Sequence, residues 1–283
     1  MSGRAPWDVR ALELLACPVC GAALAELPDG AGLRCSEGHA FDRARQGHVT
    51  LLPPGHRPPS GDSAAMVADR VAFLDAGHYA GITATLDDAV GDPATLLDLG
   101  GGTGHHLAGL LDRRPDAVGL VLDSSPYAAR RAARAHPRAV AVVADSWARL
   151  PVRDGVVDAV LVVFAPRNGP EIARVIRPEG RLVVVTPAPD HLAELVGPLG
   201  LLRVDPDKAT RLAASLEPDL APVGSGSHRE ELALTRAAAA TLVGMGPHAR
   251  HTSPAAIAAG LARMPEPIAV TVSVDVSSYR RGG

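Results

Sequence analysis

Long apolar runs, lysine and cysteine are all scarce in this 283-residue chain, and each shortage excludes a class of protein. Although 47% of the residues are hydrophobic, no apolar run reaches the roughly 18 residues that cross a bilayer, so we expect no membrane segment. The first ten residues lack the apolar core of a secretory signal, and we therefore expect a cytoplasmic protein. The formal net charge of −3 gives no overall attraction for nucleic acid, so any such contact would come from local basic patches.

The most informative segment is a glycine loop between an apolar strand and a helix. Residues 96–99 predict the strand, four glycines among residues 100–104 form the loop, and residues 105–111 have the apolar spacing of a helix. A loop that grips the phosphates of a nucleoside triphosphate ends in Gly-Lys-Ser or Gly-Lys-Thr. This loop ends in Gly-His-His, and the single lysine of the chain is Lys208. The loop therefore predicts a small-molecule site that is not a P-loop.

An acidic residue stands at the end of each of three consecutive predicted strands. Asp98 precedes the first loop glycine, Asp123 follows about 20 residues beyond the loop, and Asp145 ends the next strand. The first acid suits a ligand with a free amino group and no phosphate, the second a ribose hydroxyl and the third an adenine amino group. Together they predict a site for S-adenosylmethionine. An aspartate after a strand is also common as a helix cap or turn residue, and for Asp145 this alternative stays open.

All three cysteines lie within the first 35 residues, in a pattern typical of a zinc site. The four expected ligands form two pairs on either side of a hairpin through residues 28–30, and they are Cys17, Cys20, Cys35 and His39. A disulfide would leave one thiol over and conflicts with a cytoplasmic chain, while a catalytic thiol does not explain the spacing. A closed Cys3His site is structural, because it folds a module too small to bury a core of its own.

The Pro- and Gly-rich stretch 53–62 predicts a linker between two domains. We expect a zinc-binding module over residues 1–55 and a catalytic domain over residues 62–283. Further helices are expected at 64–74, 81–90, 191–202, 208–216, 231–243 and 255–264, and further strands at 118–123, 139–145, 159–164, 181–186 and 268–276. This alternation predicts a doubly wound α/β sheet with the zinc module in front.

Two basic patches are candidates for contact with nucleic acid. Between Arg34 and Arg57 there are four arginines and three histidines against Glu37 and Asp42. A second group crowds one short helix and consists of Arg130, Arg131, Arg134, His136 and Arg138. For the helix we favour a solvated outer face. The first patch overlaps the zinc pattern and is the better candidate.

With these motifs the chain resembles the bacterial 23S rRNA (guanine-N1)-methyltransferases, particularly the branch of tylosin- and mycinamicin-resistance enzymes of actinomycetes. Beyond the zinc set, the resemblance is carried by residues 41–42, 46–49, 73–79, 98–106, 163–168 and 185–192. It implies a class I, Rossmann-like methyltransferase sheet, S-adenosyl-L-methionine and Zn2+ as cofactors, a zinc module that helps to grip an rRNA hairpin, and a homodimer.

The resemblance also implies which residues contact the cofactor. It adds Tyr79, Gly102, Thr103 and His191 to the residues derived above. The complete expected cofactor site is Tyr79, Asp98, Gly100, Gly102, Thr103, Gly104, Asp123, Asp145 and His191.

The implied reaction transfers a methyl group from S-adenosylmethionine to N1 of a guanine in a 23S rRNA hairpin loop, with tylosin-type macrolide resistance as its expected effect. Guanine N1 lies on the base-pairing edge, so the base must be splayed out of its helix. Phe164 is a candidate for stacking on that guanine, although core packing explains it equally well, and Arg167 or Asn168 is a candidate for contacting O6. No residue stands out as a general base, and positioning of the two reactants supplies much of the rate.

Two other functions stay open. A methyltransferase that acts on a small molecule would share the cofactor pocket but would have no need for a zinc module with basic flanks. An RNA-binding protein with an inactive methyltransferase domain would be expected to lack the three strand-end acids, all of which are present.

Overall fold

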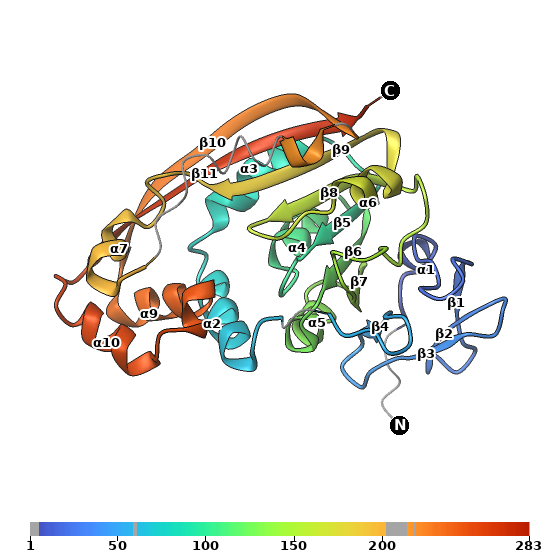
Figure 1. Ribbon diagram of the computed structural model, residues 1–283, viewed down its shortest axis with the longest axis horizontal. Coiled ribbons are helices and arrows are strands. Elements are labelled where there is room, and N and C mark those ends of the chain that lie inside the picture. Colours follow the sequence, from blue (N-terminus) through green and yellow to red (C-terminus); the bar gives the residue numbers. More distant parts are fainter. Residues whose placement is uncertain (1–5, 59–60, 202–213, 218, 283) are drawn as a thin grey trace.

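A computed structural model describes residues 6–58, 61–201, 214–217 and 219–282, with an eight-stranded sheet at its centre (Figure 1). The strands lie in the order β10-β11-β9-β8-β5-β6-β7-β4. Their bounds are β4 Val49–Thr50, β5 Thr95–Leu99, β6 Val118–Asp123, β7 Ala139–Val143, β8 Val157–Val163, β9 Ile176–Pro187, β10 Leu220–Leu234 and β11 Ile268–Arg281. The strands from β4 to β9 pair in parallel, and β11 and β10 add an antiparallel edge. The predicted α/β sheet is confirmed.

Helices cover both faces of this sheet, because alternate side chains of each strand point to opposite sides. On β5, Leu97 and Leu99 belong to one apolar layer and Leu96 to the other. The helices are α1 Val9–Leu12, α2 Ala64–Asp75, α3 Ala80–Val90, α4 His105–Asp112, α5 Pro126–Ala132, α6 Gly169–Val175, α7 Ala193–Leu199, α9 Arg236–Gly244, η1 Pro247–Arg250 and α10 Pro254–Leu261. The first layer includes residues of α1 and α6, and the second includes residues of the other α-helices.

The N-terminal segment packs directly against the main sheet. It folds into a small antiparallel sheet of β1 Leu24–Glu26, β2 Gly32–Cys35 and β3 Ala40–Asp42. Leu24 and Leu33 of this small sheet belong to the first apolar layer of the main sheet. Leu15 forms a bridge with Val152, and β4 extends the main sheet beside β7. The small sheet therefore shares its apolar core with the rest of the protein.

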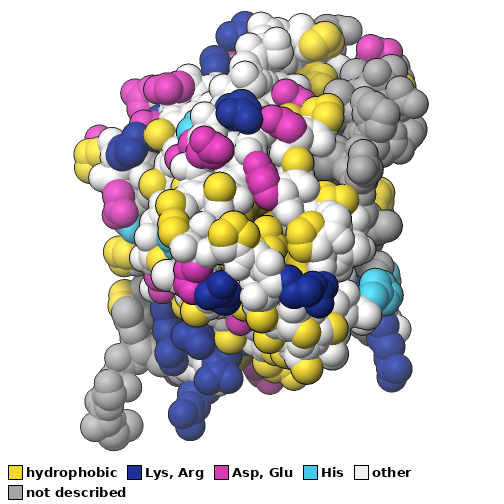
Figure 2. All heavy atoms as spheres, turned by 90° about the vertical axis from the view of Figure 1, so that its left-hand side faces the viewer, with side chains coloured by type: hydrophobic (Ala, Val, Ile, Leu, Met, Phe, Trp, Pro, Cys, Tyr) yellow, Lys and Arg dark blue, Asp and Glu magenta, His cyan; other side chains and the backbone are white. Residues whose placement is uncertain are grey.

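The C-terminal part forms a long antiparallel ribbon and a group of helices. Figure 1 shows β10 and β11 running along one edge of the molecule toward α7, α9 and α10. On the face formed by these helices, hydrophobic side chains reach the surface between charged ones (Figure 2). In α10, for example, Ile257 and Leu261 are buried while the alanines between them are exposed. None of the helices in the described ranges combines the length and apolarity of a membrane span.

Several predicted elements differ from the structure near the C-terminus. The helix expected at 231–243 is wrong over its first residues, because residues 231–234 belong to β10 and the helix begins only after the cap residue Thr235. β10 was not predicted at all. The helix expected at 191–202 is shorter, because Leu192 adopts a left-handed conformation before Ala193. The helix at 255–264 ends at Leu261, and most of the one at 208–216 lies outside the described residues.

Candidate functional site

A cavity of about 800 Å³ lies at the carboxyl ends of the central parallel strands. Its wall is formed by the loops after β5, β6, β7 and β8, which are brought to one edge by the parallel register. Residues of α9 and η1 close the opposite side. Ligands of open α/β sheets bind at this edge, and this cavity is therefore the candidate site.

The glycine loop after β5 is held tightly against β6. The amides of Gly100 and Gly101 both donate to the carbonyl of Leu122, at 2.7 and 3.2 Å, and the amide of Gly102 donates to Oδ2 of Asp123 at 2.9 Å. A Cβ atom at Gly101 would lie only 2.5 Å from the carboxyl carbon of Asp98. The loop can therefore approach the acid only because this position has no side chain.

Asp98 is a buried carboxylate that faces the cavity without a hydrogen-bond partner. The residue is 1% exposed, and neither carboxylate oxygen has a partner of acceptable geometry among the described residues. Burial and the nearby charge of Asp123 raise the pKa of Asp98 to about 7; the backbone amide of Leu107, which lies near the carboxylate without meeting hydrogen-bond geometry, offsets part of this rise. An unpartnered buried charge is costly unless a ligand neutralises it. The ammonium group of S-adenosylmethionine has the chemistry that this carboxylate needs.

The other two strand-end acids are already hydrogen-bonded. Asp123 accepts from the amides of Gly102 and Ser125, and burial raises its pKa while these amides partly oppose the rise. Asp145 accepts from the amide of Trp147 at 2.9 Å, as a turn residue does, and its second oxygen lies 2.8 Å from Nε2 of His56. Both acids also line the cavity. His56 comes from the linker and was not predicted, since nothing in its local sequence pairs it with Asp145.

An aromatic row runs along one wall of the cavity. The ring centroid of Phe164 lies 6.2 Å from that of Tyr79 and 5.7 Å from that of His191. Tyr79 is buried, which raises the pKa of its hydroxyl. Phe164 follows β8 with a left-handed φ of 54° and is 42% exposed. The structure thus brings these three predicted residues together in the pocket, and Phe164 among them is partly exposed.

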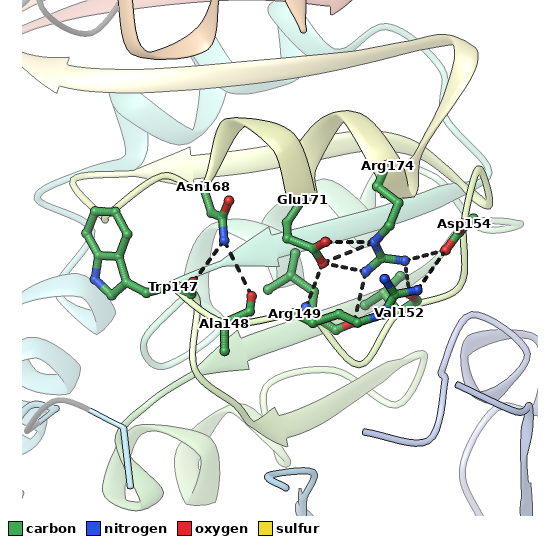
Figure 3. Close-up of polar contacts among 9 residues, drawn as sticks. Trp147, Ala148, Arg149, Val152, Asp154, Asn168, Glu171 and Arg174 are labelled. Carbon is green, nitrogen blue, oxygen red and sulfur yellow. Dashed lines mark hydrogen bonds and ion pairs between the residues drawn. The ribbon is translucent and has the colours of Figure 1, made fainter. Parts of the chain in front are cut away.

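Arg167 and Asn168 lie beyond the residues that line the cavity. The side-chain amide of Asn168 donates to the carbonyls of Trp147 and Ala148, at 3.1 and 3.4 Å (Figure 3). Burial lowers the pKa of the Arg167 guanidinium. Asn168 therefore holds the loop after β7, a role that was not predicted.

A network on α6 holds the next part of the same loop. Glu171 accepts from the amide of Leu150 at 2.8 Å, and Arg174 donates to the carbonyls of Leu150 and Val152 (Figure 3). Glu171 and Arg174 also form an ion pair at 2.6 Å. The loop after β7 is consequently fixed to α6 and to Asn168, the residue before that helix.

The four predicted zinc ligands come together in the N-terminal module. Their ligand atoms all lie within 4.8 Å of one another. Sγ of Cys20 is 3.7 Å from Sγ of Cys35, and Nδ1 of His39 is 3.7 Å from Sγ of Cys17 and 3.4 Å from Sγ of Cys35. Tetrahedral zinc with bonds of about 2.3 Å to sulfur and about 2.0 Å to nitrogen places its ligands roughly 3.5–3.8 Å apart. The donor set and its spacing therefore fit Zn2+.

Comparisons with known proteins match both parts of the chain. The family model described as "RlmA, N-terminal", a zinc ribbon, matches residues 15–58, and a "Methyltransferase domain" model matches residues 96–180. A Streptomyces fradiae protein, the 23S rRNA (guanine(748)-N(1))-methyltransferase, is 50% identical over 95% of this chain and 97% of its own length. A Micromonospora griseorubida protein assigned to 23S rRNA (guanine-N1)-methylation is 51% identical over 95% of this chain and 98% of its own.

The chain is also similar to solved structures. A methyltransferase from Thiobacillus denitrificans in complex with S-adenosyl-L-homocysteine shares 18% identity at a TM-score of 0.46, over 71% of this chain and 90% of that one.

The zinc site generates the first prediction. Replacing Cys20, whose side chain is exposed at the module surface, by serine removes one thiolate ligand. We expect Cys20→Ser to lose bound zinc and to lower the midpoint of thermal unfolding by on the order of 10 °C. Metal analysis and calorimetry measure both effects. Ser36→Ala, next to the ligand Cys35, is the matched control and should retain zinc; equal zinc content in both variants would contradict the assignment.

The buried Asp98 carboxylate generates the second prediction. Because its folded pKa of about 7 exceeds the unfolded value of about 3.9, its contribution to stability is full below about pH 4 and is lost as the pH rises through about 7. We expect Asp98→Asn to raise the free energy of unfolding of the ligand-free protein at pH 8 by about 2–4 kcal/mol. The same variant should bind S-adenosylmethionine more weakly. Denaturant unfolding at pH 5 and pH 8 checks this prediction. If the free energy of unfolding rises equally at both pH values, ionisation of Asp98 is not the cause.

Proposed function

Because this chain belongs to the 23S rRNA (guanine-N1)-methyltransferase family, we propose that it transfers a methyl group from S-adenosylmethionine to N1 of a guanine in a 23S rRNA hairpin loop. The acceptor that we propose is the guanine at the position named for the Streptomyces fradiae relative, guanine 748. The observation that carries the proposal is the similarity over nearly the whole chain, which includes both the Cys3His cluster and the cavity. Tylosin-type macrolide resistance is the physiological effect that we propose.

In the proposed mechanism the pocket residues bind and orient the two reactants. S-adenosylmethionine supplies a methyl group activated by its positive sulfur. Asp98 would pair with the ammonium group, Asp123 with the ribose hydroxyls and Asp145 with the adenine amino group, supported by Tyr79 and His191 and by the glycine loop at Gly100, Gly102, Thr103 and Gly104. As the N1–methyl bond forms and the sulfur–methyl bond breaks, S-adenosylhomocysteine is left and the proton on N1 passes to water. Alignment of the two reactants within the cavity contributes much of the rate.

The acceptor guanine is proposed to lie beside the aromatic row. Phe164 presents a half-exposed ring at the cavity wall, and stacking on such a ring is the usual way to hold an unstacked RNA base. Arg167, although it lies beyond the cavity lining, is retained as a candidate for contacting O6. For Asn168 we propose instead that Oδ1 accepts from an N–H group on the guanine edge, because its amide nitrogen is bonded to the loop after β7 and an amide oxygen cannot donate to O6.

The N-terminal module, residues 1–55, is proposed to grip the rRNA, while residues 62–283 carry the transfer reaction. Within the first basic patch, Arg34, Arg45 and Arg57 are exposed, which leaves them accessible to phosphate. Arg43 instead lies over the ring of Trp7 at 4.1 Å and pairs with Glu26. We further propose that the protein acts in the cytoplasm as a homodimer, which light scattering of the purified protein tests.

Primer extension on 23S rRNA tests the proposed function. A methyl group on guanine N1 blocks the pairing edge, so we expect a stop at guanine 748 that requires both the protein and S-adenosylmethionine. Asp98→Asn should weaken the stop. Cofactor binding without any stop would favour the small-molecule methyltransferase, whereas absence of cofactor binding would favour an RNA-binding protein with an inactive domain.

The three exposed arginines generate a further prediction. Replacing Arg34, Arg45 and Arg57 together by alanine should weaken binding of the rRNA hairpin and reduce the slope of log K against log salt by about 2, since each lost phosphate contact with single-stranded RNA contributes about 0.7. Fluorescence anisotropy at several salt concentrations measures this slope. A triple variant at the surface arginines Arg113, Arg177 and Arg229, each in an ion pair, is the control and should leave the slope nearly unchanged. Equal effects of the two triple variants would argue against the first basic patch as a site of contact with the rRNA.

A further inference from the structure

Arg70 of α2 is a pocket residue that the sequence motifs do not include. Its side chain is 25% exposed and lines the cavity next to the glycine loop. We propose that Arg70 binds the α-carboxylate of the methionine part of S-adenosylmethionine. This assignment rests on the proposed use of that cofactor. It gives the carboxylate a cationic partner, which the three acids cannot supply.

An acidic and a basic side chain approach two consecutive glycines of the same loop. A Cβ atom at Gly101 would lie 2.5 Å from the carboxyl carbon of Asp98, and one at Gly102 would lie 2.7 Å from Nη1 of Arg70. Neighbouring Cα atoms are about 3.8 Å apart, so the two side chains approach adjacent units of one loop. The amino-acid end of S-adenosylmethionine carries an ammonium and a carboxylate on one carbon. Asp98 and Arg70, which approach neighbouring residues of the loop, match the positive ammonium and the negative carboxylate.

The contacts of Arg70 fix the orientation of its guanidinium group and involve only one of its two terminal nitrogens. Nη2 donates to the carbonyl of Met245 at 3.0 Å and lies 2.6 Å from Oδ2 of Asp62. Both contacts use the same nitrogen, while Nη1 is the atom that approaches Gly102. A guanidinium held at one end in this way can offer its remaining N–H groups to a carboxylate without first losing rotamer freedom.

The other basic side chains beside the loop cannot replace Arg70. His105 and His106 begin α4 directly after the loop, and both line the cavity. Burial lowers the pKa of His105, and it lowers that of His106 to about 3. Both rings are therefore neutral at pH 7, whereas an arginine stays charged. Arg70 is the cation that the described residues place against this loop.

Binding of a matched pair of ligands tests the assignment. S-adenosylhomocysteine has the carboxylate, while 5′-deoxy-5′-(3-aminopropylthio)adenosine differs from it only by lacking that group. By calorimetry we expect Arg70→Ala to raise the Kd of S-adenosylhomocysteine about 10-fold or more and to leave the Kd of the decarboxylated ligand within about 2-fold. Arg70→Lys, which keeps the charge but not the fork, should fall between. Asp98→Asn should weaken both ligands, because both keep the ammonium group.

The controls separate a ligand contact from a structural role. Arg177 is an exposed arginine that pairs with Asp158 away from the cavity lining, and Arg177→Ala should leave the ratio of the two Kd values unchanged. An equal loss for both ligands in Arg70→Ala, or no loss for either, would overturn the proposal. Failure of the unaltered protein to bind S-adenosylhomocysteine would instead overturn the proposed function itself. Thermal unfolding of Arg70→Ala and Arg70→Lys verifies that both variants are folded.

Discussion

The buried carboxylate of Asp98 is the constraint on which the organisation of the pocket depends. A charge that is 1% exposed and has no hydrogen-bond partner among the described residues destabilises the ligand-free fold. Its neighbours fit this arrangement: Gly101 has no side chain to block the approach, and the loop is tied to β6 through Leu122. A cationic ligand converts the same carboxylate into a favourable contact. The pocket is thus built for an occupant with a positive charge at one defined point, and the stability lost without it is recovered on binding.

The linker connects the zinc module to this pocket through two polar contacts. His56 bonds to Asp145 after β7, and Asp62 pairs with Arg70 above the glycine loop. Both linker residues therefore engage side chains that line the cavity. Because Leu24 and Leu33 also share the apolar core of the main sheet, the module has a fixed position against the sheet.

The sequence predicts those features that depend on residues close together in the chain. The spacing from Cys17 to His39 and the run from Leu96 to Gly104 are local, and the strands that end at Asp123 and Asp145 have strong apolar periodicity. The contacts of His56 and Arg70 are long-range, and nothing in the pattern of α2 distinguishes a pocket arginine from a solvated one. β10 was missed for a related reason. It pairs on one side only, with β11, and its exposed Gly- and Ser-rich residues lack the alternation of a half-buried strand.

Asn168 and the helix that follows it, α6, hold the loop after β7 at the rim of the cavity. Asn168 holds the carbonyl of Trp147, and Glu171 and Arg174 hold the backbone at Leu150. The amide of Trp147 is bonded in turn to Asp145, so this residue has both main-chain polar groups occupied while its side chain is 58% exposed. Phe164 stands before the same helix with its ring also exposed. Two aromatic side chains at the rim thus project from backbone that is already ordered, and a splayed RNA segment that contacts them would not have to order it on binding.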